Sequence, residues 1–131
     1  MPRQKKTDQL TPLELEIMKV LWETGSANVQ TVQQNLPREL AYTTVQTMLN
    51  VLQNKGKVKR VLKNRAYFYR PVVSRRRVVE QTVGDIIDRL FSGSAESLVM
   101  GLLETKHLTP DRLARMQEIM AQKKEEDDGN N

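Results

Sequence analysis

The sequence predicts a mainly helical fold in which three short helices precede a β-hairpin and three more helices follow it. Two proline-containing caps, Thr11-Pro12 and Thr109-Pro110, mark helix starts in the two halves of the chain. Between residues 57 and 72 the pattern changes from helical to extended, with aromatic and β-branched residues. Three helices followed by a hairpin is the element order of a winged helix-turn-helix. We therefore assign residues 1–73 to such a domain and residues 74–122 to a three-helix C-terminal domain.

The first helix carries a start signal and a stop signal. Thr11, Pro12 and Glu14 fit a capping box with proline at the first helical position. Gly25 suits the left-handed residue that ends many helices. We expect this helix to bury four apolar residues: Leu13, Ile17, Val20 and Leu21.

The next two helices are shorter but show the same apolar spacing. The second is predicted to start at Asn28, a favourable N-cap, and to stop before Pro37. The third should span about residues 41–54 and end at Lys55-Gly56. The inner faces of the two helices are predicted to consist of Val29, Val32 and Leu36, and of Val45, Met48, Leu49 and Leu52.

Residues 57–62 and 66–72 are predicted to pair as strands, joined by Lys63-Asn64-Arg65. Pro71 suits the end of a strand. The aromatic run at residues 67–69 could stack the bases of a single-stranded nucleic acid. We favour the alternative that these rings, like Trp22, pack against the helices.

The C-terminal part contains three further helix signals. Ser74 caps a long helix that Gly93 ends, Ser94 opens a shorter helix, and Thr109 caps the last one. Residues 123–131 are rich in charge, and we expect a disordered acidic tail there.

The long helix over residues 78–91 has a wide apolar stripe, and few aromatic residues are available to build a separate core around it. These helices could fold back onto the N-terminal domain, but we favour pairing with a second copy of the chain. The residues expected at this dimer interface are Val79, Val83, Ile86, Ile87, Leu90, Phe91, Leu98, Leu102, Leu113 and Met116.

Positive charge is concentrated in the N-terminal half. The chain carries a net charge of +5; residues 1–73 hold 12 Lys/Arg against 5 Asp/Glu, and residues 74–131 hold 9 against 11. Residues 55–70 contain seven basic side chains and no acid. This asymmetry indicates a polyanionic partner, although a basic patch can also be a solvated face.

The third helix has an outer face without charge. Thr43, Gln46, Thr47 and Asn50 follow the i, i+3, i+4, i+7 spacing of one helix face. In a helix-turn-helix, the second helix of the motif lies in the major groove. Amide side chains can pair with adenine, and threonine can bond a base or contact a thymine methyl. A solvated polar face is the alternative.

The basic segment that follows favours DNA binding over that alternative, because a wing can grip the flanking phosphates. The side chains predicted for this role are Lys55, Lys57, Lys59, Arg60, Lys63 and Arg65.

Several classes of function find little support in the sequence. The single histidine, His107, is accompanied by no cysteine and by no convincing catalytic triad or metal-ligand set, so we expect a surface loop residue and no enzyme. The absence of cysteine excludes disulfides and thiolate metal sites, and we expect no cofactor. No apolar run could span a membrane, and the N-terminus lacks a secretory apolar region, which together favour a cytoplasmic location without membrane insertion.

The stretches AYTTVQTMLNVLQNKGKVKR and NRAYFYRPVVSR strongly resemble the penicillinase-repressor family of bacterial regulators, which includes the repressors of β-lactamase and of methicillin resistance. LTPLELEIMKVLWETG is similar to the first helix of that family, and LFSGSAESLVMGLLE to its dimerisation region. The resemblance covers residues 9–120.

The resemblance implies a homodimer that binds an inverted-repeat operator and represses transcription. It places Thr43, Thr44, Gln46 and Thr47 against DNA, and Lys63, Asn64 and Arg65 at the wing tip. In the antibiotic-responsive branch, a membrane sensor protease triggers cleavage of the repressor within the dimerisation region. The corresponding residues here are Met100, Gly101 and Leu102; Gly101-Leu102 replaces the Asn-Phe of that branch.

A second hypothesis is a winged-helix module that binds protein without a specific DNA target. Such a module should carry apolar residues on the outer face of its third helix, where this chain has Thr, Gln and Asn.

Overall fold

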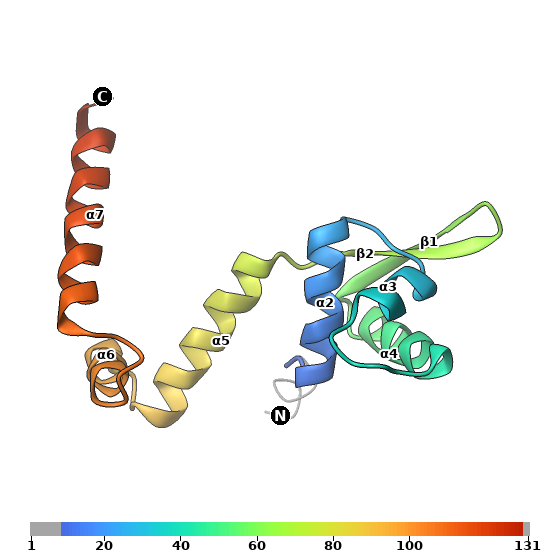
Figure 1. Cartoon of the computed structure of the whole chain (residues 1–131), viewed down its shortest axis with the longest axis horizontal. Coiled ribbons are helices and arrows are strands. Elements are labelled where there is room, and N and C mark those ends of the chain that lie inside the picture. The colour runs from blue at the N-terminus through green and yellow to red at the C-terminus, as the bar shows by residue number, and fades with distance from the viewer. Residues whose placement is uncertain (1–8, 130–131) are drawn as a thin grey trace. The chain divides into compact units, whose positions relative to one another are not determined.

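The computed structural model describes residues 9–129; residues 1–8 and 130–131, including the start of the predicted first domain and the end of the predicted tail, lie outside it. In the described part, the elements are α2 (Pro12–Thr24), α3 (Val29–Asn35), α4 (Tyr42–Asn54), β1 (Val58–Lys63), β2 (Ala66–Pro71), α5 (Arg75–Leu90), α6 (Ala95–Glu104) and α7 (Pro110–Gly129) (Figure 1). This order confirms the predicted mainly helical fold with a two-stranded hairpin after three helices.

The chain divides into two compact units, Met1–Glu80 and Gln81–Asn131. The division falls inside α5, whereas the sequence places the domain boundary at residues 73–74, which stays a prediction. We describe the units separately.

The predicted capping box of α2 is confirmed in both of its hydrogen bonds. The Glu14 backbone N–H donates to Thr11 Oγ1 over 3.2 Å, and the Thr11 N–H donates to Glu14 Oε1 over 2.7 Å. At the other end Gly25 adopts φ 80° and its N–H bonds the Leu21 carbonyl. Both helix ends are therefore determined by local chemistry.

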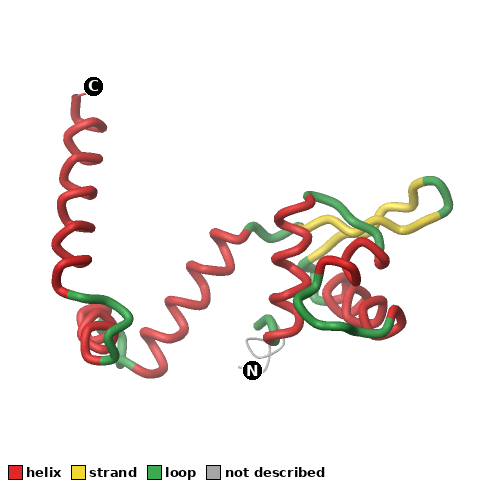
Figure 2. The backbone as a smooth tube through the Cα atoms, viewed as in Figure 1, coloured by secondary structure: helices red, strands yellow, loops and turns green. Residues whose placement is uncertain are grey.

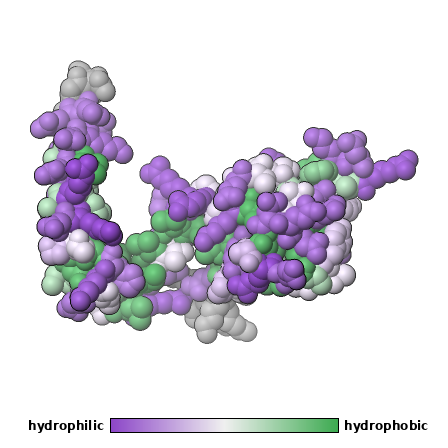
Figure 3. All heavy atoms as spheres, viewed as in Figure 1, coloured by the Kyte–Doolittle hydropathy of each residue, from purple (hydrophilic) through white to green (hydrophobic). Residues whose placement is uncertain are grey.

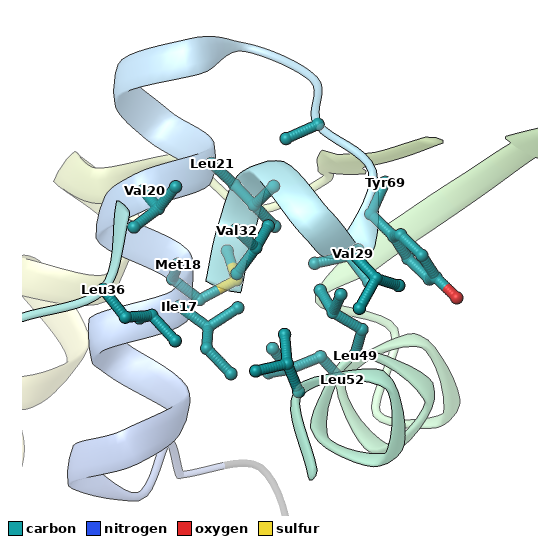
Figure 4. Packing of buried hydrophobic residues seen from close by; sticks show 13 residues of the cluster. Ile17, Met18, Val20, Leu21, Val29, Val32, Leu36, Leu49, Leu52 and Tyr69 are labelled. Atoms are coloured by element: carbon teal, nitrogen blue, oxygen red, sulfur yellow. The ribbon is translucent and has the colours of Figure 1, made fainter. Parts of the chain in front are cut away.

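A single hydrophobic cluster joins α2, α3, α4 and the base of the hairpin (Figure 4). It contains Ile17, Met18, Val20, Leu21, Ala27, Val29, Val32, Leu36, Val45, Leu49, Leu52, Val58 and Tyr69. Full burial of a Val, Leu or Ile side chain contributes about 1.5–3 kcal/mol. One expectation needs correction: Leu13 is only half-buried, and Met18 is fully buried in its stead, because the core covers α2 from a slightly different side.

β1 and β2 pair antiparallel, with Lys63 opposite Ala66, so a two-residue turn of Asn64 and Arg65 connects them. Both turn residues have positive φ, 52° and 68°. This is the backbone of a type I′ turn, whose twist matches that of the strands. The distal half of the hairpin extends beyond the three helices (Figure 2).

The hairpin register separates the aromatic run. Tyr69 is 2% exposed and belongs to the core, Phe68 is half-buried, and Tyr67 is 45% exposed. The expectation that the rings pack against the helices is therefore confirmed for Tyr69 and wrong for Tyr67, while Phe68 lies on the strand face opposite Tyr69. Side chains alternate between the two faces of a strand, so Tyr67 shares the face of Tyr69, but it lies two residues nearer the turn and is less covered by the helices. Trp22 is half-buried against the core, and its indole N–H donates to the Val73 carbonyl over 2.9 Å.

The second unit consists of the larger part of α5, together with α6 and α7. The predicted caps are present: Ser94 accepts from the Ser97 N–H, and Thr109 accepts from the Arg112 N–H. Neither α5 nor α6 contains a buried residue.

α7 continues as a helix through Gly129, whereas the sequence suggested a disordered tail from residue 123. Residues 121–126 (Ala-Gln-Lys-Lys-Glu-Glu) all have high helix propensity, which accounts for the extension.

Among residues 9–129, no helix is both long and apolar enough to cross a membrane. The same residues bring together no group of three His, Cys, Asp or Glu that could hold a metal ion.

Candidate nucleic-acid interface

α4 presents two chemically different faces, as its spacing predicts. Val45, Leu49 and Leu52 are fully buried and hold the helix on the core. The opposite face is exposed and uncharged; it consists of Thr43, Thr44, Gln46, Thr47 and Asn50. The predicted base-reading residues therefore all lie at the surface of one helix.

The N-terminus of α4 has no side-chain cap. Ala41 occupies the N-cap position and offers no side-chain hydrogen-bond acceptor to the first turn. The partial positive charge of a helix N-terminus favours an anion such as a phosphate. Tyr42, at the first helical position, is 48% exposed beside this end.

A groove of about 340 Å³ lies between the start of α3, the first turns of α4 and the hairpin. Its polar lining includes Gln30, Tyr42, Gln46, Arg65 and Tyr67. Gln46, on the outer face of α4, and Arg65, at the wing tip, therefore line the same groove. The sequence predicts Gln46 and Arg65 as DNA contacts and Tyr67 only as a possible stacking residue, and it does not indicate Gln30 or Tyr42.

Tyr42 could have been found from the sequence, because it lies one helical turn before Gln46. Gln30 belongs to α3, and no sequence pattern connects it with the hairpin.

The predicted basic residues divide between the two faces of the hairpin. Arg60 lies opposite Tyr69 in the register and therefore shares the face that looks toward the helices. Its guanidinium lies 4.4 Å from the centre of the Tyr67 ring, a cation–π contact that orients it. The opposite face carries Lys59, Lys63 and Arg70, all exposed.

Arg65 and Asn64 form the exposed turn itself, and the tip of the hairpin is hydrophilic in Figure 3. Lys57 precedes β1 and is half-buried. The predicted wing residues other than Lys55 are thus on or next to the hairpin.

Lys55 lies apart from these residues. Its ammonium contacts the Glu14 carboxylate at 2.9 Å, and the Glu14 side chain is 2% exposed. Burial alone raises the pKa of Glu14, but hydrogen bonds from Thr11 and Lys55 and the charge of Lys55 bring that pKa below its ordinary value. The structure thus gives Lys55 a role in joining the start of α2 to the end of α4.

Asn50 also has an intramolecular partner. Its Oδ1 accepts a hydrogen bond from the Tyr69 hydroxyl over 3.3 Å. This bond connects the outer face of α4 to β2.

Residues 10–122 match the protein family described as Penicillinase repressor. The chain belongs to this family. It is 29% identical over 122 residues to the penicillinase repressor of Bacillus licheniformis, covering 92% of this chain and 95% of the relative. It is 34% identical over 103 residues to the transcriptional regulator BlaI of Mycobacterium tuberculosis, covering 76% and 75% of the two chains. The family is named for repressors and not for an enzymatic activity.

The structure is also similar to the crystal structure of the YusO protein from Bacillus subtilis, with a TM-score of 0.52. The match covers 94% of this chain and 80% of that one at 16% identity, so it speaks for the fold alone.

Proposed function

We propose that this member of the penicillinase repressor family is a sequence-specific DNA-binding transcriptional repressor. The observation that carries the proposal is the uncharged, exposed outer face of α4 beside a basic hairpin. Its assignment as a repressor comes from the family and from relatives named as repressors. It is not an enzyme.

In this function α4 enters the major groove with its outer face toward the base edges. The threonines and Gln46 are short and uncharged, so the helix can approach the bases closely and discriminate by hydrogen bonds and methyl contacts. The open N-terminus of α4 faces a phosphate. Discrimination therefore resides in α4.

The wing supplies attraction that does not depend on sequence. Lys59, Lys63 and Arg65 are exposed and contact the phosphate backbone beside the groove that α4 occupies. Arg60, held on Tyr67, grips from the face that looks toward the helices. This division explains why the reading helix itself needs no positive charge.

The C-terminal helices make the protein a homodimer. Five of the predicted interface residues, Val79, Val83, Ile86, Leu90 and Met116, are exposed in the single chain, with Leu90 at 75%. The other five, Ile87, Phe91, Leu98, Leu102 and Leu113, are half-buried. Hydrophobic surface over α5 is visible in Figure 3. Burial against a second copy removes this surface from water and matches two winged helices to an inverted-repeat operator.

We also propose that repression is relieved by proteolysis started by a membrane sensor protease, at the region Met100, Gly101 and Leu102. These residues lie within α6, and the ring of Phe91 packs against Gly101. Cleavage at this place therefore requires α6 to unwind locally. A protease-resistant α6 in cells exposed to the inducing signal would contradict this part of the proposal.

The decisive experiment measures binding of the full chain to a palindromic operator and to a scrambled duplex across a salt series. We expect strong preference for the operator. Gln46→Ala should reduce that preference at one base pair, whereas Lys63→Ala should weaken both duplexes equally. Equal affinity for both duplexes in the unsubstituted protein would favour the alternative of a winged-helix module that binds protein.

A further inference from the structure

Tyr69 is held at three points. Its backbone N–H and carbonyl exchange hydrogen bonds with Ala27, at 2.8 and 3.0 Å, in an isolated bridge outside the hairpin. Its ring is 2% exposed within the core, and its hydroxyl points out of the cluster (Figure 4). Little freedom remains for the phenolic oxygen to move.

Asn50 lies where this hydroxyl leaves the core. It is on the outer face of α4, four residues after Gln46, and is exposed. Its Oδ1 accepts from the Tyr69 hydroxyl over 3.3 Å. The carboxamide therefore directs its oxygen inward and its two N–H donors toward the surface.

The flipped orientation of the Asn50 amide, with Nδ2 toward Tyr69, is disfavoured because it leaves a hydrogen-bond donor without an acceptor. If Nδ2 faced the phenol, the phenolic oxygen would accept and its own proton would lose the acceptor that Oδ1 provides. A buried hydroxyl without an acceptor is costly. Tyr69 thus selects one of the two orientations of the Asn50 amide.

We propose that Tyr69 is a positioning residue that makes Asn50 a donor-only contact on the DNA-facing surface. Bidentate pairing with adenine uses the amide oxygen and nitrogen together. Because the oxygen points inward to Tyr69 and away from the surface, only the two N–H donors of Asn50 reach the DNA, where they donate to a base edge or to a phosphate oxygen. This inference rests on the proposed DNA-binding function.

The first test needs no DNA. In a nitrogen-15 NMR spectrum of the full chain, Tyr69→Phe should shift the side-chain amide signals of Asn50, identified by their loss in Asn50→Ala. Tyr67→Phe removes the same hydroxyl from an exposed tyrosine on the same hairpin face and should leave those signals in place. Unchanged Asn50 signals in Tyr69→Phe, with a native thermal transition, would overturn the inference.

The second test is a double-mutant cycle on operator binding. Asn50→Ala should weaken binding about 3- to 10-fold, as expected for one hydrogen bond. Tyr69→Phe should weaken binding by a smaller factor, and this effect should vanish in the Asn50→Ala background. Asn50→Asp keeps an acceptor for Tyr69, but it removes both donors and adds a negative charge beside the DNA, so it should lose more affinity than Asn50→Ala. Independent, multiplying effects of the two positions would refute the coupling.

The Asn50→Ala variant also shows whether the DNA acceptor of Asn50 is a base or a phosphate. A base acceptor makes the Asn50→Ala loss depend on one base pair, whereas a phosphate makes it equal on all duplexes. In either case the loss should persist when operator adenines are replaced, one at a time, by a purine without the 6-amino group. A loss that disappears with one such replacement would show adenine pairing and refute the donor-only role.

If the unsubstituted protein does not prefer its operator, the proposed function fails. If it does prefer its operator but the double-mutant cycle shows no coupling between Tyr69 and Asn50, only this inference fails.

Discussion

The two units of this chain differ in how much of their hydrophobic side-chain surface they bury. The N-terminal unit closes a core around α2, α3, α4 and Tyr69, in which thirteen hydrophobic residues are at most 9% exposed. The C-terminal helices have similar apolar spacing, yet α5 and α6 bury no residue. The same kind of apolar pattern is thus buried within the chain in the N-terminal unit and left exposed to solvent in the C-terminal helices. The difference predicts that one unit is stable alone and the other depends on a partner.

Separating the two units gives the largest expected effect. A chain ending at Glu80 should unfold cooperatively and remain monomeric, because its core is complete. Its operator affinity should fall by about 10²- to 10⁴-fold, the usual contribution of a second linked binding unit. Analytical ultracentrifugation and operator titration measure both quantities. Tight dimerisation of the truncated chain would contradict the comparison.

The same substitution in each unit sharpens the contrast. Leu49→Ala removes a fully buried side chain and should lower the free energy of unfolding by about 2–5 kcal/mol. Leu90→Ala removes a side chain that is 75% exposed in the single chain. It should leave the thermal transition of the N-terminal unit unchanged and raise the dimer dissociation constant. If the two substitutions destabilise the N-terminal unit equally, the assignment of Leu90 to an interface is wrong.

Lys55→Met tests whether Lys55 stabilises the fold through Glu14 or contacts DNA phosphates. Removing it leaves the Glu14 carboxylate buried without its cation, at a cost of about 3 kcal/mol. The salt dependence of DNA binding should not change. Lys63→Met, the matched substitution on the wing, should leave stability intact and reduce the salt slope by about one unit. A reduced slope in Lys55→Met would restore Lys55 to the phosphate contacts.

Acid should weaken the N-terminal unit through Glu14. The pKa of Glu14 is lower in the folded protein than its ordinary value of 4.5, so the unfolded state binds this proton more readily. The stabilisation is complete above about pH 4.5 and is lost as the pH falls through the folded pKa. Denaturant unfolding from pH 6 to pH 3 should show a smaller decline in Glu14→Gln. Parallel curves would show that Glu14 does not carry the effect.

The smallest effect is expected at the wing tip. Arg65 has φ 68°, a conformation that glycine adopts without strain. Arg65→Gly should therefore stabilise the N-terminal unit by up to about 1 kcal/mol while weakening binding to all duplexes. Thermal unfolding and a salt titration separate the two consequences. Lower stability in Arg65→Gly would mean that the arginine side chain supports the hairpin.

Local chemistry made much of the fold predictable from the sequence. The Thr11 and Asn28 caps, the left-handed Gly25 and the apolar spacing of α4 each act within a few residues, so the helix bounds and the outer face of α4 could be predicted. The basic hairpin could be predicted for the same reason.

Contacts between distant residues were decided only by the tertiary structure. Glu14 and Lys55 are 41 positions apart, and neither residue type indicates that packing of α2 on α4 joins them. The register of the hairpin buries Tyr69 and leaves Tyr67 exposed, although the two are equivalent in sequence. Periodicity tells which residues share a face of one element. Which polar atoms meet between elements, as Tyr69 meets Asn50, depends on how those elements pack in three dimensions.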